Sequence, residues 1–396
     1  MMSPRDDPFR VLMLCPQFRP LVGGYERAAE RLSGALARSG MSVVVVTERR
    51  DRAWPAVERF DGFEIRRLAC SVRYKLHSVT SLLAIAGYLL RCGRRFDIWH
   101  IHQYGRHAAL AAVLGKVLGC PVVLKLTSSA GMGVGNTVGT GFAGRLLGFF
   151  HRRVSACFAS TEETRDEAIR FGIPAENVHL VPNGVDGIQF KPATPAERRA
   201  ARSVLGLECK HLVLSVARLS SEKNPLGLLD AWAALDNESR RGSLLALVGD
   251  GPQWSMAQAK VRALNLEGSV YLARERSDVV TWYRAADFLV ISSCNEGLSN
   301  TMIEALACGL PIISTRVSGS SILTEDPACG MLVDTQDSMQ LTGAIGTLLR
   351  NEALRSRMAR NARPRFESRF SVDQVSANVR SLYLKLRDRR VRRSAA

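Results

Sequence analysis

Short apolar runs alternate with amphipathic stretches along the whole chain, a pattern typical of strands and helices that build parallel sheets. The helical spacing of apolar residues is clearest at residues 25–40 and 76–94. A strand, a helix and a second strand in succession form a βαβ unit, which implies a parallel sheet. Polar residues 51–60 are interpreted as a connection. In the first half, the runs predict strands at residues 9–15, 41–47, 63–69, 97–102, 121–126, 154–159 and 177–182.

The second half repeats the alternation and then becomes helical from about residue 338, with an amphipathic stretch at 370–386. Two similar halves predict an α/β fold of two Rossmann-like, doubly wound domains with a cleft between them. The polar stretch 190–203 is the expected linker. The strands of the second half are expected at residues 211–217, 243–249, 269–273, 287–292 and 311–314. The expected domains are residues 1–190, 191–369 and a C-terminal segment 370–396 with a basic tail.

The composition allows two ordinary cores and adds a strong positive charge. Of 396 residues, 46% are hydrophobic, which excludes general disorder. The net charge of +17 fits three kinds of partner: nucleic acid, an anionic membrane surface or a phosphorylated substrate.

The cysteines and the apolar runs bear on the compartment. The nine cysteines are scattered and contain no C-x-x-C pair, which argues against a disulfide framework or a zinc site and for a reducing environment. The first ten residues have no apolar signal-peptide core. The longest near-apolar run, residues 79–90, is shorter than the roughly 20 residues that a membrane span needs. We therefore expect a cytoplasmic protein.

Two glutamates mark the stretch 293–311, which joins a predicted strand to a predicted helix. Glu296 falls in the loop at the carboxyl end of the strand, where open α/β sheets bind ligands, and it has no evident local structural role. Glu304 falls inside the helix, and its spacing from Thr301 also fits a capping box. Backbone N–H groups at the positive end of this helix would suit a leaving diphosphate; they belong to Gly297, Leu298 and Ser299.

Two cations follow the strand at residues 211–217. Arg218 and Lys223 could hold a diphosphate, with roughly 4 kcal/mol of raw Coulomb attraction per contact at 4 Å before desolvation. The alternative is a solvated loop with ordinary surface charges. The Gly249–Asp250 loop, after the next strand, could pass close to a nucleotide base or be a plain tight turn.

Two further features belong to the first half. Gly23 and Gly24 lie between a strand and a helix, where backbone N–H groups could approach a phosphate, although a plain turn has the same pattern. His100 and His102 should point the same way from a strand end, as metal ligands, as acid/base groups or as neither. A loop with five glycines within residues 121–141 could cover the cleft or be only a flexible surface loop.

Taken together, these motifs resemble those of the retaining family 4 glycosyltransferases, which have the GT-B fold. The stretch EGLSNTMIEALACGLP resembles the E-x7-E signature of that family, and GGYE resembles its N-terminal glycine loop. The segment VPNGVD resembles the approach to the linker, ARL and EKN resemble the phosphate-binding pair, and VGDGP resembles the loop near the base. The resemblance covers nearly the whole chain.

The resemblance implies a role for each matching residue. Arg218 and Lys223 would hold the donor diphosphate, Glu304 the nucleotide ribose and Glu296 the donor sugar, and Gly24 would bring backbone close to the phosphates. It also implies retention of the anomeric configuration, no bound metal and no cofactor, and a last helix that packs back on the N-terminal domain.

Three positions depart from the family pattern. The histidine that such enzymes often carry after the strand at residues 121–126 is replaced here by Thr127 or Ser128. Those two residues are candidates on the acceptor side, and His102 is a separate candidate there because of its position at a strand end, not as a substitute for the missing histidine. Arg274 replaces a common glycine, and Ile322 replaces a common glutamate.

The function expected from these features is transfer of a sugar from a UDP- or GDP-sugar to a glycan or polyprenyl-linked acceptor, as in cell-envelope or exopolysaccharide synthesis. The alternatives are a GT-B epimerase or a phosphorylase and, outside enzymes, a basic nucleic-acid-binding protein. No nucleic-acid-binding signature accompanies the charge. Basic residues flank residues 79–90 and fill the tail at 385–393, which favours peripheral association with an anionic inner membrane face.

Overall fold

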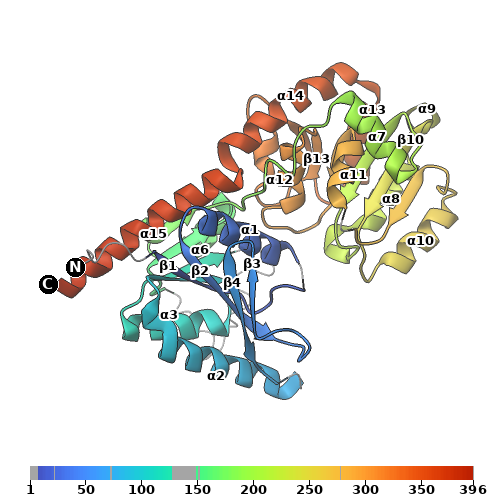
Figure 1. Cartoon of the computed structure of the whole chain (residues 1–396). Helices are drawn as coiled ribbons and strands as arrows, with labels where there is room; N and C mark the ends of the chain where they lie inside the picture. The colour runs from blue at the N-terminus through green and yellow to red at the C-terminus, as the bar shows by residue number, and fades with distance from the viewer. Residues whose placement is uncertain are drawn as a thin grey trace. The chain divides into compact units, whose positions relative to one another are not determined.

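The computed structural model describes residues 8–21, 23–71, 74–126, 149, 152–276 and 278–395. It divides into two compact units. The first comprises Met1–Gly184 together with Val372–Ala396, and the second comprises Val185–Ser371. Each unit is an α/β domain with its own sheet (Figure 1).

The first unit is built on an eight-stranded sheet in the order β3-β4-β2-β1-β5-β6-β7-β8. All neighbouring strands pair in parallel except β3 and β4. The strands are β1 (Arg10–Leu14), β2 (Ser42–Arg49), β3 (Val57–Phe60), β4 (Phe63–Ala69), β5 (Ile98–His102), β6 (Val122–Leu126), β7 (Ala156–Ala159) and β8 (Val178–Leu180). The helices are α1 (Gly24–Arg38), α2 (Tyr74–Cys92), α3 (Arg106–Leu118), α6 (Glu162–Arg170) and α15 (Val372–Ala395), with a short 3-10 helix η1 (Gly93–Arg95).

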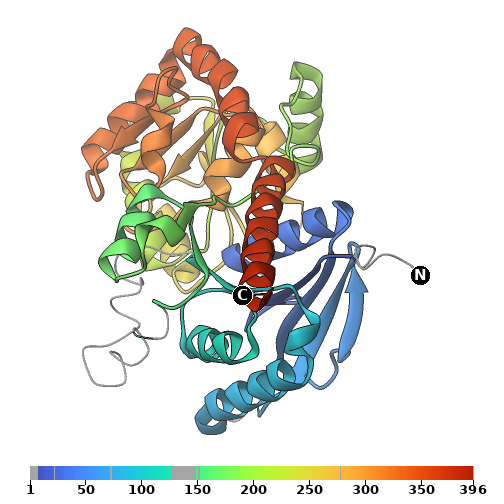
Figure 2. The ribbon, with the colours of Figure 1, turned by 90° about the vertical axis from the view of Figure 1, so that its left-hand side faces the viewer.

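Alternation along β1 explains how this sheet is covered. Val11 and Met13 face a core that includes apolar residues of α1 and α15, whereas Leu12 and Leu14 face a core that includes residues of α2 and α3. Both faces are therefore buried, as parallel sheets require. Figures 1 and 2 show α1 and α15 on one face and α2 and α3 on the other.

Strand β3 corrects the prediction that residues 51–60 are only a connection. It pairs antiparallel with β4 through a turn at Asp61–Gly62, whose φ angles are 46° and 82°. Two positive φ values in a two-residue turn are the type I′ geometry that Asp-Gly favours in hairpins. The strand is short, lies at the sheet edge and has no fully buried residue, so its apolar signal is weak.

The second unit has a six-stranded parallel sheet in the order β11-β10-β9-β12-β13-β14. Its strands are β9 (His211–Val216), β10 (Ser243–Val248), β11 (Val270–Ala273), β12 (Phe288–Ile291), β13 (Ile312–Thr315) and β14 (Gly330–Val333). Its helices are α7 (Pro195–Leu205), α8 (Pro225–Ala233), α9 (Asn237–Arg240), α10 (Trp254–Ala263), α11 (Val279–Ala285), α12 (Asn300–Ala307), α13 (Ser338–Arg350) and α14 (Glu352–Arg369).

Two separate cores cover the faces of the second sheet. One gathers residues of α7, α11, α12 and α14, and the other gathers residues of α8, α10 and α13. Strand β14 was not among the predicted strands, since two of its four residues are only half-buried.

The boundaries of the units differ slightly from the expected ones. The first unit ends at Gly184 rather than at residue 190. Val185 and Phe190 are buried in the core of the second unit, which moves the boundary toward the N-terminus. The last helix, α15, groups with the first unit and contributes Val375, Val379 and Tyr383 to its core.

One stretch among the described residues, Leu76–Arg95, is long and apolar enough to cross a membrane by length and composition, and 22% of it is buried. The stretch is longer than the predicted apolar run at 79–90. Its Ile85 and Leu89 pack in the core beneath the sheet, so one face of α2 serves the fold. A single such helix is weak evidence for a membrane span.

Candidate donor-binding site

The candidate site lies at the carboxyl ends of β9 and β12, which are neighbours in the second sheet. The chain winds outward from β9 to β10 and β11 on one side, and from β12 to β13 and β14 on the other. Loops leave the sheet in opposite directions at such a switch point and open a crevice for ligands. The loop after β9 carries Arg218 and Lys223, and the loop after β12 carries Glu296.

The loop after β9 is held in a defined conformation. Arg218 is exposed, and Lys223 ends a short 3-10 helix, η3 (Ser221–Lys223). Asn224 follows with φ 50° and caps α8 by accepting a hydrogen bond from the N–H of Gly227. Ser292, at the end of β12, donates to the Lys223 carbonyl at 2.9 Å. The backbone that carries Lys223 is thus fixed to the neighbouring strand.

The two loops place Lys223 and Glu296 in direct contact. The Lys223 Nζ lies 2.8 Å from Oε1 of Glu296, and Ser293 Oγ donates to Oε2 of the same carboxylate at 2.9 Å. The backbone N–H of Cys294 also donates to the Glu222 carbonyl at 2.8 Å. Two predicted site residues from different loops therefore share one partly buried spot, with side chains 21% and 16% exposed.

Glu304 lies inside α12 and is 3% exposed. The capping-box alternative for it is wrong, because Ser299 is the N-cap of α12 and Thr301 instead donates to the carbonyl of Val216. A carboxylate at this depth needs hydrogen-bond donors. Tyr283 of α11 provides one, with its hydroxyl 3.0 Å from Glu304 Oε2.

Tyr283 is a residue of the candidate site that sequence reasoning missed. Its side chain is fully buried, and burial, followed by the charge of Glu304, raises the pKa of its hydroxyl well above the usual value. The hydroxyl therefore stays protonated and donates to Glu304 at every physiological pH. Its helix, α11, offered no signal, since a buried tyrosine in an amphipathic helix looks like ordinary core.

The N-terminus of α12 lies beside the carboxylate of Glu296. Leu298 and Ser299 are buried and Gly297 is half-buried, so this segment is packed rather than loose. The Ser299 hydroxyl accepts from the N–H of Met302. The partial positive charge of the helix N-terminus is therefore fixed near Glu296.

The Gly249–Asp250 loop runs directly beside the Arg218 loop, continuing the pairing of β9 with β10. Gly249 has φ 149°, and a Cβ there would lie 2.0 Å from the Ala217 carbonyl oxygen, so only glycine fits. The backbone N–H of Leu219 donates to the Asp250 carbonyl at 2.9 Å. The Asp250 carboxylate pairs with Arg274 at 2.6 Å, which lowers the pKa of Asp250. Arg274, noted as a departure from the family pattern, thus engages a predicted site residue.

Comparison with known families decides the identity of this arrangement. Residues 197–365 match the family "Glycosyl transferases group 1", and residues 23–184 match "Glycosyl transferase 4-like domain". The chain belongs to the family 4 glycosyltransferases. The two matches span both units and include the motifs quoted above, except that the last two residues of VPNGVD lie between the matched ranges.

Curated relatives of this glycosyltransferase align with most of its length. A D-inositol 3-phosphate glycosyltransferase of Xylanimonas cellulosilytica is 29% identical, with 96% of this chain and 98% of the relative covered. An alpha-D-kanosaminyltransferase of Streptomyces kanamyceticus is 27% identical, with 72% of this chain and 76% of the relative covered.

Solved structures show that the glycosyltransferase has the GT-B fold. The Anabaena protein HepE in complex with UDP-glucose matches with a TM-score of 0.78 at 20% identity, covering 95% of this chain and 99% of that one. The sucrose-phosphate synthase of Thermosynechococcus elongatus matches with a TM-score of 0.78 at 22% identity, covering 96% and 99%.

In the first unit of the glycosyltransferase, the glycine pair opens α1. Gly23 is the N-cap and Gly24 is the first helical residue. A Cβ on Gly23 would lie 2.5 Å from Oε2 of Glu26, so the carboxylate of Glu26 packs against this glycine. Glu26 is 2% exposed, and burial raises its pKa. The sequence motif contained Glu26, but its burial at the helix start was not foreseen.

The histidines point the same way, as predicted, with ring centroids 4.5 Å apart. His100 contacts the Tyr383 hydroxyl, and both rings are buried. Burial, and then the positive charge of Lys125, lower the pKa of His102 to about 3, so its ring is neutral. The acceptor-side role of His102 stays a prediction, and the burial of its ring argues against a direct contact with an acceptor.

The other acceptor-side candidates, Thr127 and Ser128, lie outside the described residues, as does the glycine-rich part of the loop that follows β6.

Proposed function

We propose that the protein transfers a hexose-type sugar from a UDP- or GDP-sugar with retention of anomeric configuration and without a metal ion at the donor. The observation that carries this proposal is the contact between Lys223 and Glu296 at the switch point of the second sheet. A cation and a carboxylate placed together there can serve the two halves of one donor, the diphosphate and the sugar.

The chemistry requires stabilisation of the negative charge that builds up on the leaving diphosphate. Lys223 and Arg218 would supply positive charge on one side, and the N-terminus of α12 would supply backbone N–H groups on the other. Glu304 would accept a hydrogen bond from a ribose hydroxyl, and Glu296 would contact the sugar. The cations take the place that a metal ion fills in other phosphoryl-group sites.

We propose a glycan or polyprenyl-linked acceptor in cell-envelope or exopolysaccharide synthesis. A second acceptor class, a small phosphorylated polyol, is supported by the name of the relative from Xylanimonas cellulosilytica and by the net charge of +17. The charge suits a polyprenyl-phosphate-linked acceptor and a phosphorylated polyol alike, because both carry phosphate.

An exposed apolar and basic surface on the first unit supports the lipid-linked class. Four apolar residues of α2 are more than half exposed, and their spacing places them on one side of the helix. They are Leu76, Val79, Leu83 and Leu90. Exposed Arg91, Arg94 and Arg95 follow at the end of this side.

The basic tail joins this surface through a tertiary contact. Arg390 of α15 donates to the carbonyl of Phe96, the residue that follows η1, at 3.3 Å. The arginines at the end of α2 and those at the end of α15 therefore form one basic region. Each basic residue near an anionic bilayer contributes about 1 kcal/mol. We propose that this surface docks on the cytoplasmic face of an anionic membrane.

Vesicle co-sedimentation tests the docking surface. The protein should bind vesicles that contain phosphatidylglycerol more strongly than pure phosphatidylcholine vesicles, and Leu83→Ser should weaken this binding several-fold. Val204→Ser is the matched control, since Val204 is 78% exposed on a helix of the other unit. Equal binding to both vesicle types, or an unaffected Leu83→Ser variant, would contradict membrane docking.

A panel of nucleotide sugars tests the transfer itself. The protein is incubated without added divalent metal with each donor, and with either a membrane lipid extract or an inositol phosphate. Nuclear magnetic resonance of the product reports its anomeric configuration. Lys223→Met should reduce transfer at least 100-fold, whereas Lys260→Met on α10 should not. Turnover of the donor without any acceptor into an isomer would indicate an epimerase instead.

A further inference from the structure

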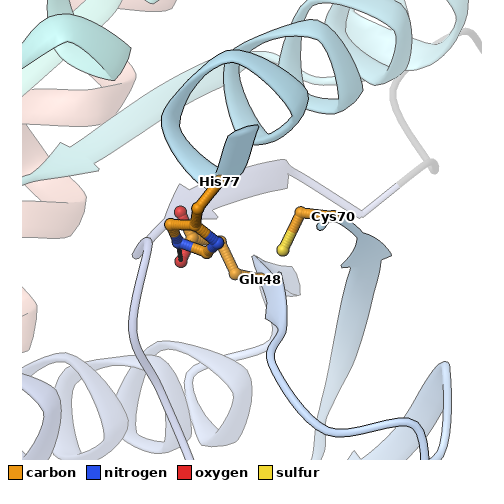
Figure 3. A group of neighbouring side chains, drawn as sticks. All are labelled: Glu48, Cys70 and His77. Carbon is orange, nitrogen blue, oxygen red and sulfur yellow. Dashed lines mark hydrogen bonds and ion pairs between the residues drawn. The ribbon is translucent and has the colours of Figure 1, made fainter. Parts of the chain in front are cut away.

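A second cluster of chemically active side chains lies in the first unit, apart from the donor-binding site. Glu48 lies near the end of β2, Cys70 directly follows β4, and His77 lies in the first turns of α2. Their ligand atoms all lie within 4.8 Å of one another. Figure 3 shows the His77 ring beside the Glu48 carboxylate, with Cys70 at the neighbouring strand end.

Hydrogen bonding fixes the tautomer of His77. Its Nδ1 lies 2.8 Å from the carbonyl oxygen of Ser71, which can only accept, so Nδ1 carries a hydrogen. Its Nε2 lies 3.1 Å from Oε2 of Glu48. If the ring were neutral, the lone pair of His77 Nε2 would therefore face a lone pair of Glu48 Oε2, which is repulsive. Either a second ring proton or a cation between the two atoms resolves this conflict.

The spacing and the surroundings suit a cation. Bonds of about 2.0 Å to nitrogen and to oxygen place those two atoms roughly 3.3 Å apart in a tetrahedral zinc site, close to the 3.1 Å observed here. The carbonyl of Ser71 behind His77 is the partner that metal-bound histidines typically have. Ser81 likewise donates to Oε1 of Glu48 at 2.6 Å and orients the carboxylate.

The charges allow the same conclusion. Arg50 also contacts Oε2 of Glu48, at 2.9 Å. A divalent ion with a Cys70 thiolate gives the cluster the same net charge as a protonated His77 ring with a neutral thiol. The His77 side chain is 27% exposed and Cys70 is half-buried, so the cluster is accessible from outside the core.

We propose that Glu48, Cys70 and His77 bind one zinc-like divalent ion, with a water molecule as the fourth ligand. The ion would join the ends of β2 and β4 to the start of α2. Its function is structural: it fixes the first turn of the helix whose exposed face is described above. The site is separate from the candidate donor-binding residues, so the proposal of a metal ion can be tested independently of the glycosyl-transfer proposal.

Cobalt titration of the full-length, chelator-treated and reduced protein tests the site. We expect one equivalent of Co²⁺ to bind with a thiolate-to-cobalt charge-transfer absorption, and zinc to displace it. Cys70→Ser should remove this absorption, and His77→Gln should weaken binding at least tenfold. Cys209→Ser, at a half-buried cysteine of the other unit, is the matched control and should change neither.

Thermal unfolding gives a second measurement that needs no spectroscopic signal. Zinc should raise the melting temperature of the wild-type protein and of Cys209→Ser, but not that of Cys70→Ser. The absence of a thiolate absorption in the wild type, or its persistence in Cys70→Ser, would overturn the proposal. A protonated His77 ring with no cobalt binding would do so as well, and would leave an ordinary ion pair with Glu48.

Discussion

The Lys223 ammonium lies 2.8 Å from the Glu296 carboxylate, although the two residues belong to loops after different strands. In the proposed reaction, the donor diphosphate must replace Glu296 as the partner of this lysine. The carboxylate therefore competes with the diphosphate for Lys223 until the sugar engages Glu296. Binding of the nucleotide and transfer of the sugar should respond differently to the loss of Glu296.

Glu296→Gln should separate the two steps. The change removes the charge that competes for Lys223, so UDP or GDP should bind as well as before or up to about fivefold more tightly, in line with an ion pair of about 1 kcal/mol. Transfer should fall at least 100-fold. Calorimetric titration with the nucleotide, alongside turnover of the full donor, measures both. The exposed Glu208→Gln variant is the control, and a Glu296→Gln enzyme with full turnover would refute the site assignment.

Tyr283→Phe should weaken nucleotide binding through Glu304. The variant removes one donor from a buried carboxylate, which costs about 1–3 kcal/mol of folding stability. If Glu304 holds the ribose, the Kd for the nucleotide should rise about tenfold while kcat stays within a few-fold. Tyr271→Phe, at a 42% exposed tyrosine of β11, is the control. A loss of stability with unchanged nucleotide affinity would show that Tyr283 stabilises the hydrophobic core but does not contribute to nucleotide binding.

Gly249→Ala should destabilise the fold, because the backbone conformation at Gly249 leaves no room for a side chain. A Cβ at Gly249 meets the carbonyl of Ala217, and the backbone lies in a region that L residues rarely adopt. We expect a loss of at least about 2 kcal/mol in the free energy of unfolding, together with weaker nucleotide binding because the Arg218 loop must shift. Gly268→Ala, where a Cβ meets open space, should cost far less in urea unfolding. Equal stability of the two variants would contradict this prediction.

The stability of the first unit should fall as the pH drops below neutrality. The pKa of His102 is lowered from 6.5 to about 3, so between these values the unfolded chain binds a proton that the folded chain does not. Stability therefore declines from about pH 6.5 toward pH 3, by on the order of 5 kcal/mol for this group. His102→Gln should flatten this decline in urea unfolding between pH 4 and 7. The half-buried His179→Gln should flatten it less.

Local patterns in the sequence predicted most of the two sheets correctly. Runs such as residues 287–292 and 211–217 are nearly continuous apolar segments, because both faces of a parallel sheet are buried. The strand-end positions of Arg218, Lys223 and Glu296 follow from those runs alone. The edge strand β3 and strand β14 were missed, because a short strand with few buried residues leaves little periodicity.

Contacts between distant segments could not be predicted in the same way. Thr301 has the spacing of a capping box with Glu304, but it bonds the carbonyl of Val216 on another strand. The proposed metal-binding cluster joins three elements with no recognisable spacing, and the absence of C-x-x-C argued against zinc. The basic tail reaches the end of α2 only through the contact of Arg390 with Phe96.

The sequence by itself thus determined the two α/β halves, the positions of most of their strands along the chain and the loops that carry the proposed donor-binding residues. Hydrophobic periodicity is a local property and is visible in a single segment. The tertiary structure decided which loops meet, because strand order in a sheet depends on how crossover connections pack. Only that packing brings Lys223 to Glu296 and buries Tyr283 against Glu304.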